Sequence, residues 1–149
     1  MGKEIEKKFI LREMPENLVQ YPYHELEQGY LNTAPVVRVR KEDEEYYLTY
    51  KGKGFLEREE YNLPLTKEAY YHLVLKADGK LIKKRRYLIP YEKHTIELDV
   101  FSSPIKDMLL AEVEFESVEE ANDFTPPEWF GEEVTGDYHY SNSYLSQIK

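Results

Sequence analysis

The chain has 149 residues, of which 20 are basic, 29 are acidic and none is cysteine; this length is typical of one domain with its own hydrophobic core. The lack of cysteine excludes disulfide scaffolds, thiolate metal sites and a cysteine nucleophile, and no apolar run approaches the roughly 20 residues of a membrane helix. The formal charge of −9 disfavours non-specific binding to nucleic acid or to an anionic membrane. We expect a single domain over residues 1–149, and a cytoplasmic location because the charged N-terminus lacks a signal-peptide pattern.

Short runs in which apolar and polar residues alternate dominate the chain and predict antiparallel strands. In chain order, the strands are expected at residues 3–12, 26–33, 36–41, 46–51, 57–63, 81–89, 95–101 and 109–116. The polar residues 41–45 and the Lys51-Gly-Lys-Gly54 segment predict turns between strands. The fold class is therefore mainly β, with an α+β composition.

Helices are predicted to be few and to lie at the periphery. Thr66 has the side chain and the position to cap a helix over residues 67–77. Ser117 begins a capping-box pattern for a short helix, and Ser141 is expected to cap a last helix near the C-terminus.

Charged residues occupy one side of nearly every predicted strand. A plain β-sandwich with a solvated charged face would show a similar alternation. Two features favour a closed barrel with the charges inside: the charged sides are almost entirely Arg, Lys, Glu and Asp, and eight strands suffice to close a barrel around one ligand. Such a lumen would contain seven bases and seven acids, namely Lys8, Arg38, Arg40, Lys51, Arg58, Lys84 and Arg86 with Glu4, Glu6, Glu60, Glu97, Asp99, Glu112 and Glu114.

The mixture of signs indicates what this lumen would bind. Arginine and lysine favour phosphate oxygens, whereas clustered carboxylates without Cys or His partners favour a hard divalent cation, Mg²⁺ or Mn²⁺. A metal-bound polyphosphate satisfies both sets. Paired acids could also serve glycoside hydrolysis, but the large basic set would then have no purpose. The four histidines show no metal-ligand spacing.

A specific series of motifs follows the same order as the predicted strands. Glu4-Ile-Glu6-Lys-Lys8 fits a Glu-x-Glu-x-Lys signature, and the later motifs are Arg38-Val-Arg40, Lys51-Gly, Arg58-Glu-Glu60, Lys84-Arg-Arg86, Glu97-Leu-Asp99, Glu112-Val-Glu114 and Gly-Asp137-Tyr-His-Tyr140-Ser-Asn142. In this combination the chain resembles the CYTH superfamily, the triphosphate tunnel metalloenzymes, over essentially its whole length. It looks like the short bacterial branch of that superfamily.

The resemblance implies an eight-stranded antiparallel tunnel that hydrolyses inorganic triphosphate or nucleoside triphosphates with Mg²⁺ or Mn²⁺. It implies metal ligands at Glu4, Glu6, Glu112 and Glu114, with Glu60, Glu97 and Asp99 as additional acids. It implies phosphate contacts from Lys8, Arg38, Arg40, Lys51, Arg58, Lys84 and Arg86. The catalytic group would comprise Glu4, Glu6 and Lys8. We read Lys8 as a phosphate-positioning or water-positioning residue, because neighbouring acids oppose the lowered pKa that a general base needs.

Several points stay open at this level. Asn62 stands where many members of the superfamily have a second acid, and a one-residue change of register would exchange Lys84 and Arg86 for Lys83 and Arg85. An adenylyl cyclase that forms cyclic AMP from ATP, and a non-catalytic module that binds polyphosphate or nucleotide, are the alternatives to hydrolysis. The physiological triphosphate and the oligomeric state, monomer or homodimer, are not predicted.

Overall fold

The alternating segments form nine strands in the computed structural model, which describes residues 2–148. The strands are β1 (Lys3–Leu11), β2 (Tyr23–Thr33), β3 (Val36–Glu42), β4 (Glu45–Lys51), β5 (Glu57–Pro64), β6 (Asp78–Tyr91), β7 (His94–Ser103), β8 (Leu109–Phe115) and β9 (Phe130–Glu133). The helices are α1 (Lys67–Val74), α2 (Val118–Asn122) and α3 (Asn142–Ser146), with 3-10 turns η1 (Leu18–Gln20) and η2 (Tyr138–Tyr140). Eight of the strands match the eight segments predicted from the sequence.

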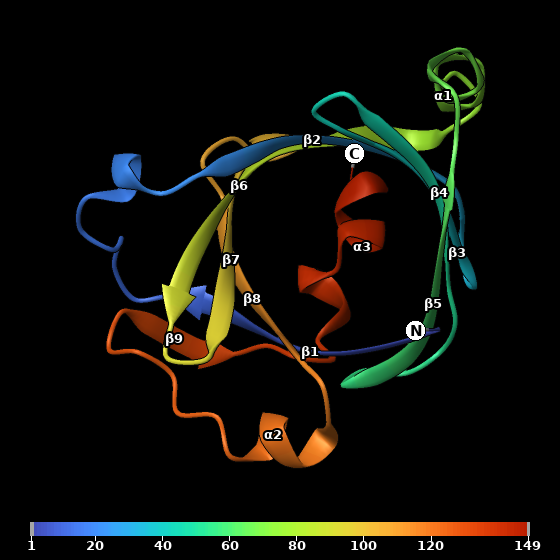
Figure 1. The fold of residues 1–149 in the computed structure, drawn as a ribbon. Coiled ribbons are helices and arrows are strands. Elements are labelled where there is room, and N and C mark those ends of the chain that lie inside the picture. The colour runs from blue at the N-terminus through green and yellow to red at the C-terminus, as the bar shows by residue number, and fades with distance from the viewer. Residues whose placement is uncertain (1, 149) are drawn as a thin grey trace.

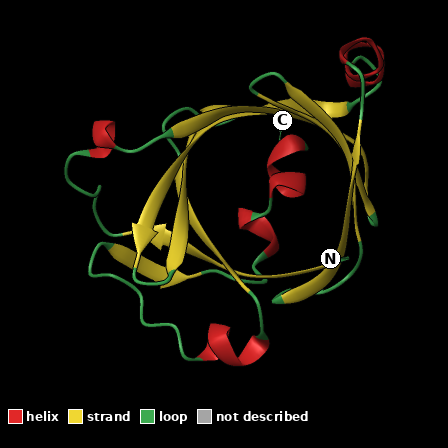
Figure 2. Cartoon of the chain, in the orientation of Figure 1, coloured by secondary structure: helices red, strands yellow, loops and turns green. Residues whose placement is uncertain are grey.

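These eight strands close into an antiparallel barrel (Figures 1 and 2). Their order is β5-β4-β3-β2-β6-β7-β8-β1, and the first residues of β1 pair with β5, with Glu4 opposite Arg58, to close the ring. The later residues of β1 pair instead with β9, where Phe9 lies opposite Glu133. The predicted eight-stranded barrel is therefore confirmed, and β9 is an addition that the sequence did not predict.

The apolar side of most strands faces outward and is covered in part by the helices and the C-terminal segment, whereas Tyr50 on β4 and Tyr61 and Leu63 on β5 stay exposed. One cluster, which includes Phe9, Leu98 and Val113, packs under α2 and against Phe124 and Phe130. The opposite side of the barrel has a second cluster, composed of Val39, Tyr46 and Tyr70 with partly buried residues around them. Burial of these faces outside the ring leaves the charged faces to line the interior, as the sequence predicts.

Helix α1 begins where the sequence predicts and ends earlier than predicted. The hydroxyl of Thr66 accepts a hydrogen bond from the backbone N–H of Ala69 at 3.0 Å, so the predicted cap is present. The helix ends at Val74 rather than at residue 77, because Asp78 already belongs to β6. Its buried anchor is Tyr70, with no exposed surface.

Helices α1 and α2 lie outside the ring, whereas α3 lies inside it (Figure 1). The expectation of peripheral helices therefore does not extend to α3. Its residue Leu145 packs with Tyr30, Ile82, Phe101 and Leu110. The physical reason is that the inward faces of the strands become apolar at this end of the barrel, and these side chains need an apolar partner. No helix among residues 2–148 is long and apolar enough to cross a membrane.

Candidate functional site

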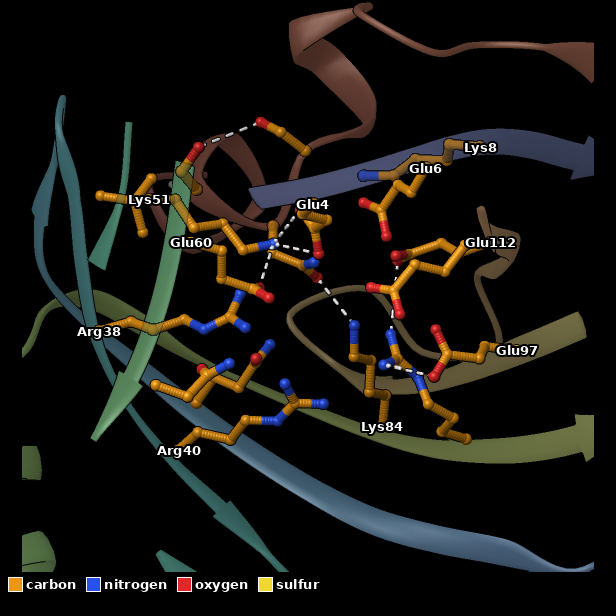
Figure 3. A pocket seen from close by; sticks show the side chains of 18 of the residues that line it. Glu4, Glu6, Lys8, Arg38, Arg40, Lys51, Glu60, Lys84, Glu97 and Glu112 are labelled. Atoms are coloured by element: carbon orange, nitrogen blue, oxygen red, sulfur yellow. Dashed lines mark hydrogen bonds and ion pairs between the residues drawn. The ribbon is translucent and has the colours of Figure 1, made fainter. Parts of the chain in front are cut away.

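The interior of the barrel holds a charged cavity of about 370 Å³. It is lined by thirteen of the fourteen charged residues that the sequence assigned to a lumen, namely Glu4, Glu6, Lys8, Arg38, Arg40, Lys51, Arg58, Glu60, Lys84, Arg86, Glu97, Glu112 and Glu114. The fourteenth, Asp99, is fully buried behind this lining. Figure 3 shows how side chains from different strands converge on the space.

The register of β6 settles the question of which basic residues face inward. The side chains of Lys84 and Arg86 are 1% and 11% exposed, whereas those of Lys83 and Arg85 are 52% and 44% exposed. Lys84 and Arg86 line the cavity. The register in which these two residues face the lumen is therefore the one that the structure adopts.

Carboxylates gather on the wall formed by β1, β7 and β8. In the antiparallel pairing of β1 and β8, Glu6 lies opposite Glu114 and Lys8 opposite Glu112. Carboxylate oxygens of Glu4, Glu6 and Glu114 lie within 4.8 Å of one another, and so do oxygens of Glu6, Glu97 and Glu112. Glu6 belongs to both groups. All donors in these groups are oxygen atoms, which is the chemistry that Mg²⁺ and Mn²⁺ favour.

Burial and neighbouring acids raise the pKa of two carboxylates in this acidic wall, whereas Lys8, Arg86 and Lys84 lower the pKa of Glu112. Burial, followed by the charges of Glu112 and Glu4, raises the pKa of Glu6 well above its ordinary value. Burial and the charges of Glu97, Glu4 and Glu60 raise the pKa of Glu114 to about 6. A divalent cation would relieve this repulsion, so the donor set and its electrostatics both fit a bound metal.

Some of the lumen bases are already neutralised by protein carboxylates. The Nζ atom of Lys51 lies 3.0 Å from Oε1 of Glu4 and 3.4 Å from Oε2 of Glu60. Arg86 also forms an ion pair with Glu97, at 3.4 Å. These contacts tie β4 to β1 and β5, and β6 to β7, across the interior.

Asp99 is the acid at the centre of a buried group of ion pairs with Arg86 and Lys84. Arg86 binds it with two hydrogen bonds, of 2.7 and 2.9 Å, and Nζ of Lys84 lies 2.7 Å from Oδ2. Burial opposes ionisation of Asp99, but Arg86 and Lys84 outweigh it and lower the pKa. Asp99 therefore acts as an internal counter-ion beneath the cavity rather than as a group on its surface.

Lys84 experiences opposing effects in the same cluster. Burial lowers its pKa to about 8, with Arg86 acting in the same direction and Asp99 opposing them. Because Nζ of Lys84 lies against the ionised Asp99, the ion pair favours the protonated amine below this value.

The C-terminal segment contributes contacts that the sequence did not assign to the site. The backbone carbonyl of Tyr140 accepts a hydrogen bond from Nζ of Lys8 at 3.1 Å, and the Thr135 hydroxyl accepts one from the Lys8 backbone N–H at 2.9 Å. Oδ1 of Asn142 accepts from Nζ of Lys84 at 3.3 Å. The motif that ends in Asn142 was noticed in the sequence, but nothing local indicates that its segment folds back onto two lumen lysines.

Two neutral residues also line the cavity, of which the sequence analysis singled out Asn62 and missed Gln28. Oδ1 of Asn62 accepts a 2.6 Å hydrogen bond from the hydroxyl of the buried Thr49. Asn62 thus forms a neutral contact at the position where an acid was expected. A second, more apolar cavity of about 950 Å³ adjoins the first and shares Glu6, Lys8 and Arg58 with it.

Comparison with known proteins agrees with this architecture. Residues 2–143 match the CYTH domain family. The chain is 38% identical to an inorganic triphosphatase of Nitrosomonas europaea, over 96% of each chain, and 38% identical to one of Acetivibrio thermocellus, over 97% of this chain and 94% of that protein. The crystal structure of the inorganic triphosphatase NE1496 superimposes with a TM-score of 0.73 at 34% identity, and covers 100% of this chain and 97% of that one. This chain therefore belongs to the CYTH domain family.

Proposed function

We propose that this protein hydrolyses inorganic triphosphate in its barrel lumen with the help of a divalent cation. The observation that carries the proposal is the meeting, in one cavity, of a carboxylate cluster with a set of arginines and lysines. An acidic cluster alone would suit a cation and a basic cluster alone would suit an anion, whereas the two together suit a metal-bound polyphosphate. The names of the two relatives support inorganic triphosphate as the substrate.

The carboxylates that we assign to the metal are Glu4, Glu6, Glu112 and Glu114, with Mg²⁺ or Mn²⁺ as the ion. A bound divalent cation would neutralise charge on the transferred phosphoryl group and polarise its P–O bonds. Glu97 belongs to one of the two carboxylate groups and is an additional candidate ligand. Glu60 is assigned a lesser role because it belongs to neither carboxylate group.

The bases would bind and align the triphosphate. Arg38 and Arg40 on β3 offer planar donor groups suited to phosphate oxygens, and Lys84 and Arg86 enter from β6, on the other side of β2. Lys51 and Arg58 would complete the clamp from β4 and β5. Phosphoryl transfer depends mainly on such positioning and on neutralisation of charge, so the protein needs no covalent intermediate.

We assign Lys8 a positioning role rather than that of a general base. Its amine donates to the Tyr140 carbonyl, and a protonated amine retains two further N–H groups for a phosphate oxygen or a water molecule. This contact fixes the position of the amine at the cavity wall.

The decisive experiment measures phosphate release from inorganic triphosphate and from ATP, with Mg²⁺ or Mn²⁺ and then with EDTA. We expect metal-dependent release from inorganic triphosphate, and loss of at least about 100-fold in kcat for the Glu4→Gln/Glu6→Gln variant, because two metal ligands lose their charge. Glu132→Gln, which changes an exposed acid, serves as the matched control. Cyclic AMP formation from ATP without release of phosphate from inorganic triphosphate would contradict the proposal, as would tight binding without turnover.

A further inference from the structure

Three buried nitrogen atoms on one wall of the cavity have no hydrogen-bond partner among the described residues. They are Nε2 of Gln28 on β2 and the Nε atoms of Arg38 and Arg40 on β3. All three residues line the cavity, and Gln28 as a whole is only 1% exposed. Buried donors are almost always satisfied in folded proteins, so three adjacent exceptions in one cavity indicate an acceptor that the protein itself does not supply.

The fold holds Gln28 in this inward position. It lies opposite Arg40 on β3 and opposite Ile82 on β6, so neighbouring strands flank it on both sides. The next residue, Gly29, faces outward, where a Cβ atom would lie 2.9 Å from Cβ of Ala77. Because side chains alternate along a strand, the close outward packing of Gly29 directs Gln28 into the lumen.

The basic side chains around Gln28 offer it nothing to donate to, because Arg38, Arg40 and Lys84 have only donor groups. Glu42, which also lines the cavity, is paired with Arg40 at 3.3 Å. An acceptor shared by Gln28 and the two arginines is best met by a group that is rich in oxygen and negatively charged. This description fits a phosphoryl group and does not fit the cation that the opposite wall would hold.

We propose that Gln28 binds the substrate directly, through donation of its side-chain N–H to a non-bridging oxygen of the triphosphate on the β2–β3 wall. This inference rests on the proposed function, because it names a further contact within the same site. It goes beyond the charged motifs, none of which includes Gln28.

A neutral donor suits this place better than another cation would. Burial and the charges of Arg38 and Arg86 already lower the pKa of Arg40 to about 10. A lysine between these arginines would add to their repulsion, whereas an amide adds a hydrogen bond without a charge. The wall thus gains one more contact to the phosphate at no electrostatic cost to the unliganded protein.

The test compares Gln28→Leu and Gln28→Glu with the parent enzyme and with Gln20→Leu, a matched change at an exposed glutamine. Loss of a hydrogen bond to a charged group should raise the KM for inorganic triphosphate about tenfold or more in Gln28→Leu, with kcat within about threefold. Gln28→Glu should bind still more weakly, because it places a carboxylate against the polyanion. An activity of Gln28→Glu equal to that of the parent would overturn the proposal, because it would identify Gln28 as an acceptor for the arginines.

Thermal unfolding separates this role from a structural one. Without ligand, Gln28→Leu should unfold at the same temperature as the parent or higher, because the change removes an unsatisfied buried donor. Sodium tripolyphosphate with Mg²⁺ should raise the unfolding temperature of the parent and raise that of Gln28→Leu less. Equal shifts in the two proteins would sink the inference. Equal shifts would not affect the proposed function if the parent still releases phosphate. A parent that binds tripolyphosphate without turnover would instead refute the proposed function and leave the contact of Gln28 untouched.

Discussion

The lumen has two kinds of basic residue, and the difference between them indicates where a ligand binds. On β6, Lys84 and Arg86 are neutralised by the buried Asp99. On β3, Arg38 has no carboxylate within ion-pair distance among residues 2–148, and its Nε donor is unsatisfied. The first group is paired within the protein. The β3 arginines keep Nε donors without a partner among the described residues, although Arg40 also pairs with Glu42 at 3.3 Å. We infer that the protein folds around the paired charges and recognises its substrate with the unpaired ones.

The most direct way to break this comparison is to remove an unpaired base. Arg38→Met should reduce kcat/KM for inorganic triphosphate by about 100-fold or more, because a buried charge-assisted contact to the substrate is lost. Its unfolding temperature without ligand should fall less than that of a variant that breaks a buried ion pair, because Arg38 has no carboxylate within ion-pair distance among residues 2–148. Steady-state kinetics and thermal unfolding of one preparation check both statements. Arg85→Met, on the outward face of β6, is the control and should retain activity.

A large loss of stability in Arg38→Met would contradict the comparison. It would mean that the unpaired arginine supports the barrel as much as the paired bases do.

Removal of the buried counter-ion Asp99 should have the opposite effect, with a larger loss of stability than of activity. Asp99→Asn leaves the buried Lys84 without its acid and Arg86 with only the longer pairs to Glu97 and Glu112, each at 3.4 Å. Breaking a buried pair typically costs about 3 to 5 kcal/mol. We expect a fall of this size in the free energy of unfolding, measured with urea at neutral pH, and some loss of activity because two clamp residues shift. Asp123→Asn, at an exposed position after α2, is the matched control.

The pH at which Asp99→Asn is compared with the parent sharpens the test. The two bases hold the pKa of Asp99 below its ordinary value. The contribution of Asp99 to stability is therefore complete above its unfolded-state pKa and disappears as the pH falls through its lower folded-state pKa. The difference between the two proteins should thus be largest near neutral pH and shrink in strong acid. A difference that stays constant down to strong acid would assign the loss to packing instead of charge.

The sequence predicted most of this architecture, because alternation of side chains along a strand is a local signal that repeats. Thirteen charged residues face one cavity for the reason that the pattern indicated. The position of Asp99 could not be predicted in the same way, because Glu97 and Asp99 share an inward face and only the packing of Lys84 and Arg86 distinguishes them. Gln28 was missed because β2 has no charged pair to mark its inward side.

Strand β9 escaped prediction for a different reason, because its four residues are too few for a periodic pattern. Helix α3 is present with its predicted Ser141 cap, but a five-residue helix has no independent stability and its place inside the barrel was not predicted. Tertiary contacts determine where they lie: β9 adds to the edge of β1 beyond its pairing with β5, and α3 covers the apolar end of the lumen. The hydrogen bonds from Lys8 to Tyr140 and from Lys84 to Asn142 depend on this placement.

The smallest expected effect is the gradual pH dependence of metal binding at the acidic wall. Burial and neighbouring acids raise the pKa of Glu114 to about 6, and a carboxyl group must lose its proton before it can bind a metal. Below pH 6 the metal therefore competes with a proton, and the dissociation constant for Mn²⁺ should rise by up to about tenfold per pH unit. Above pH 6 this group contributes no further change. Titration calorimetry with Mn²⁺ between pH 5 and 8 measures the effect on the protein without substrate.

Glu114→Gln provides the control for that titration, because it removes the group that titrates and leaves the shape of the wall almost unchanged. The variant should bind Mn²⁺ more weakly at neutral pH and should show a shallower pH dependence below pH 6. Some dependence should remain, since the pKa of Glu6 is raised by the same acidic neighbours. If the variant retained both the affinity and the slope of the parent, Glu114 would not be a ligand. The metal site would then be restricted to Glu6, Glu97 and Glu112, the group of carboxylates that does not include it.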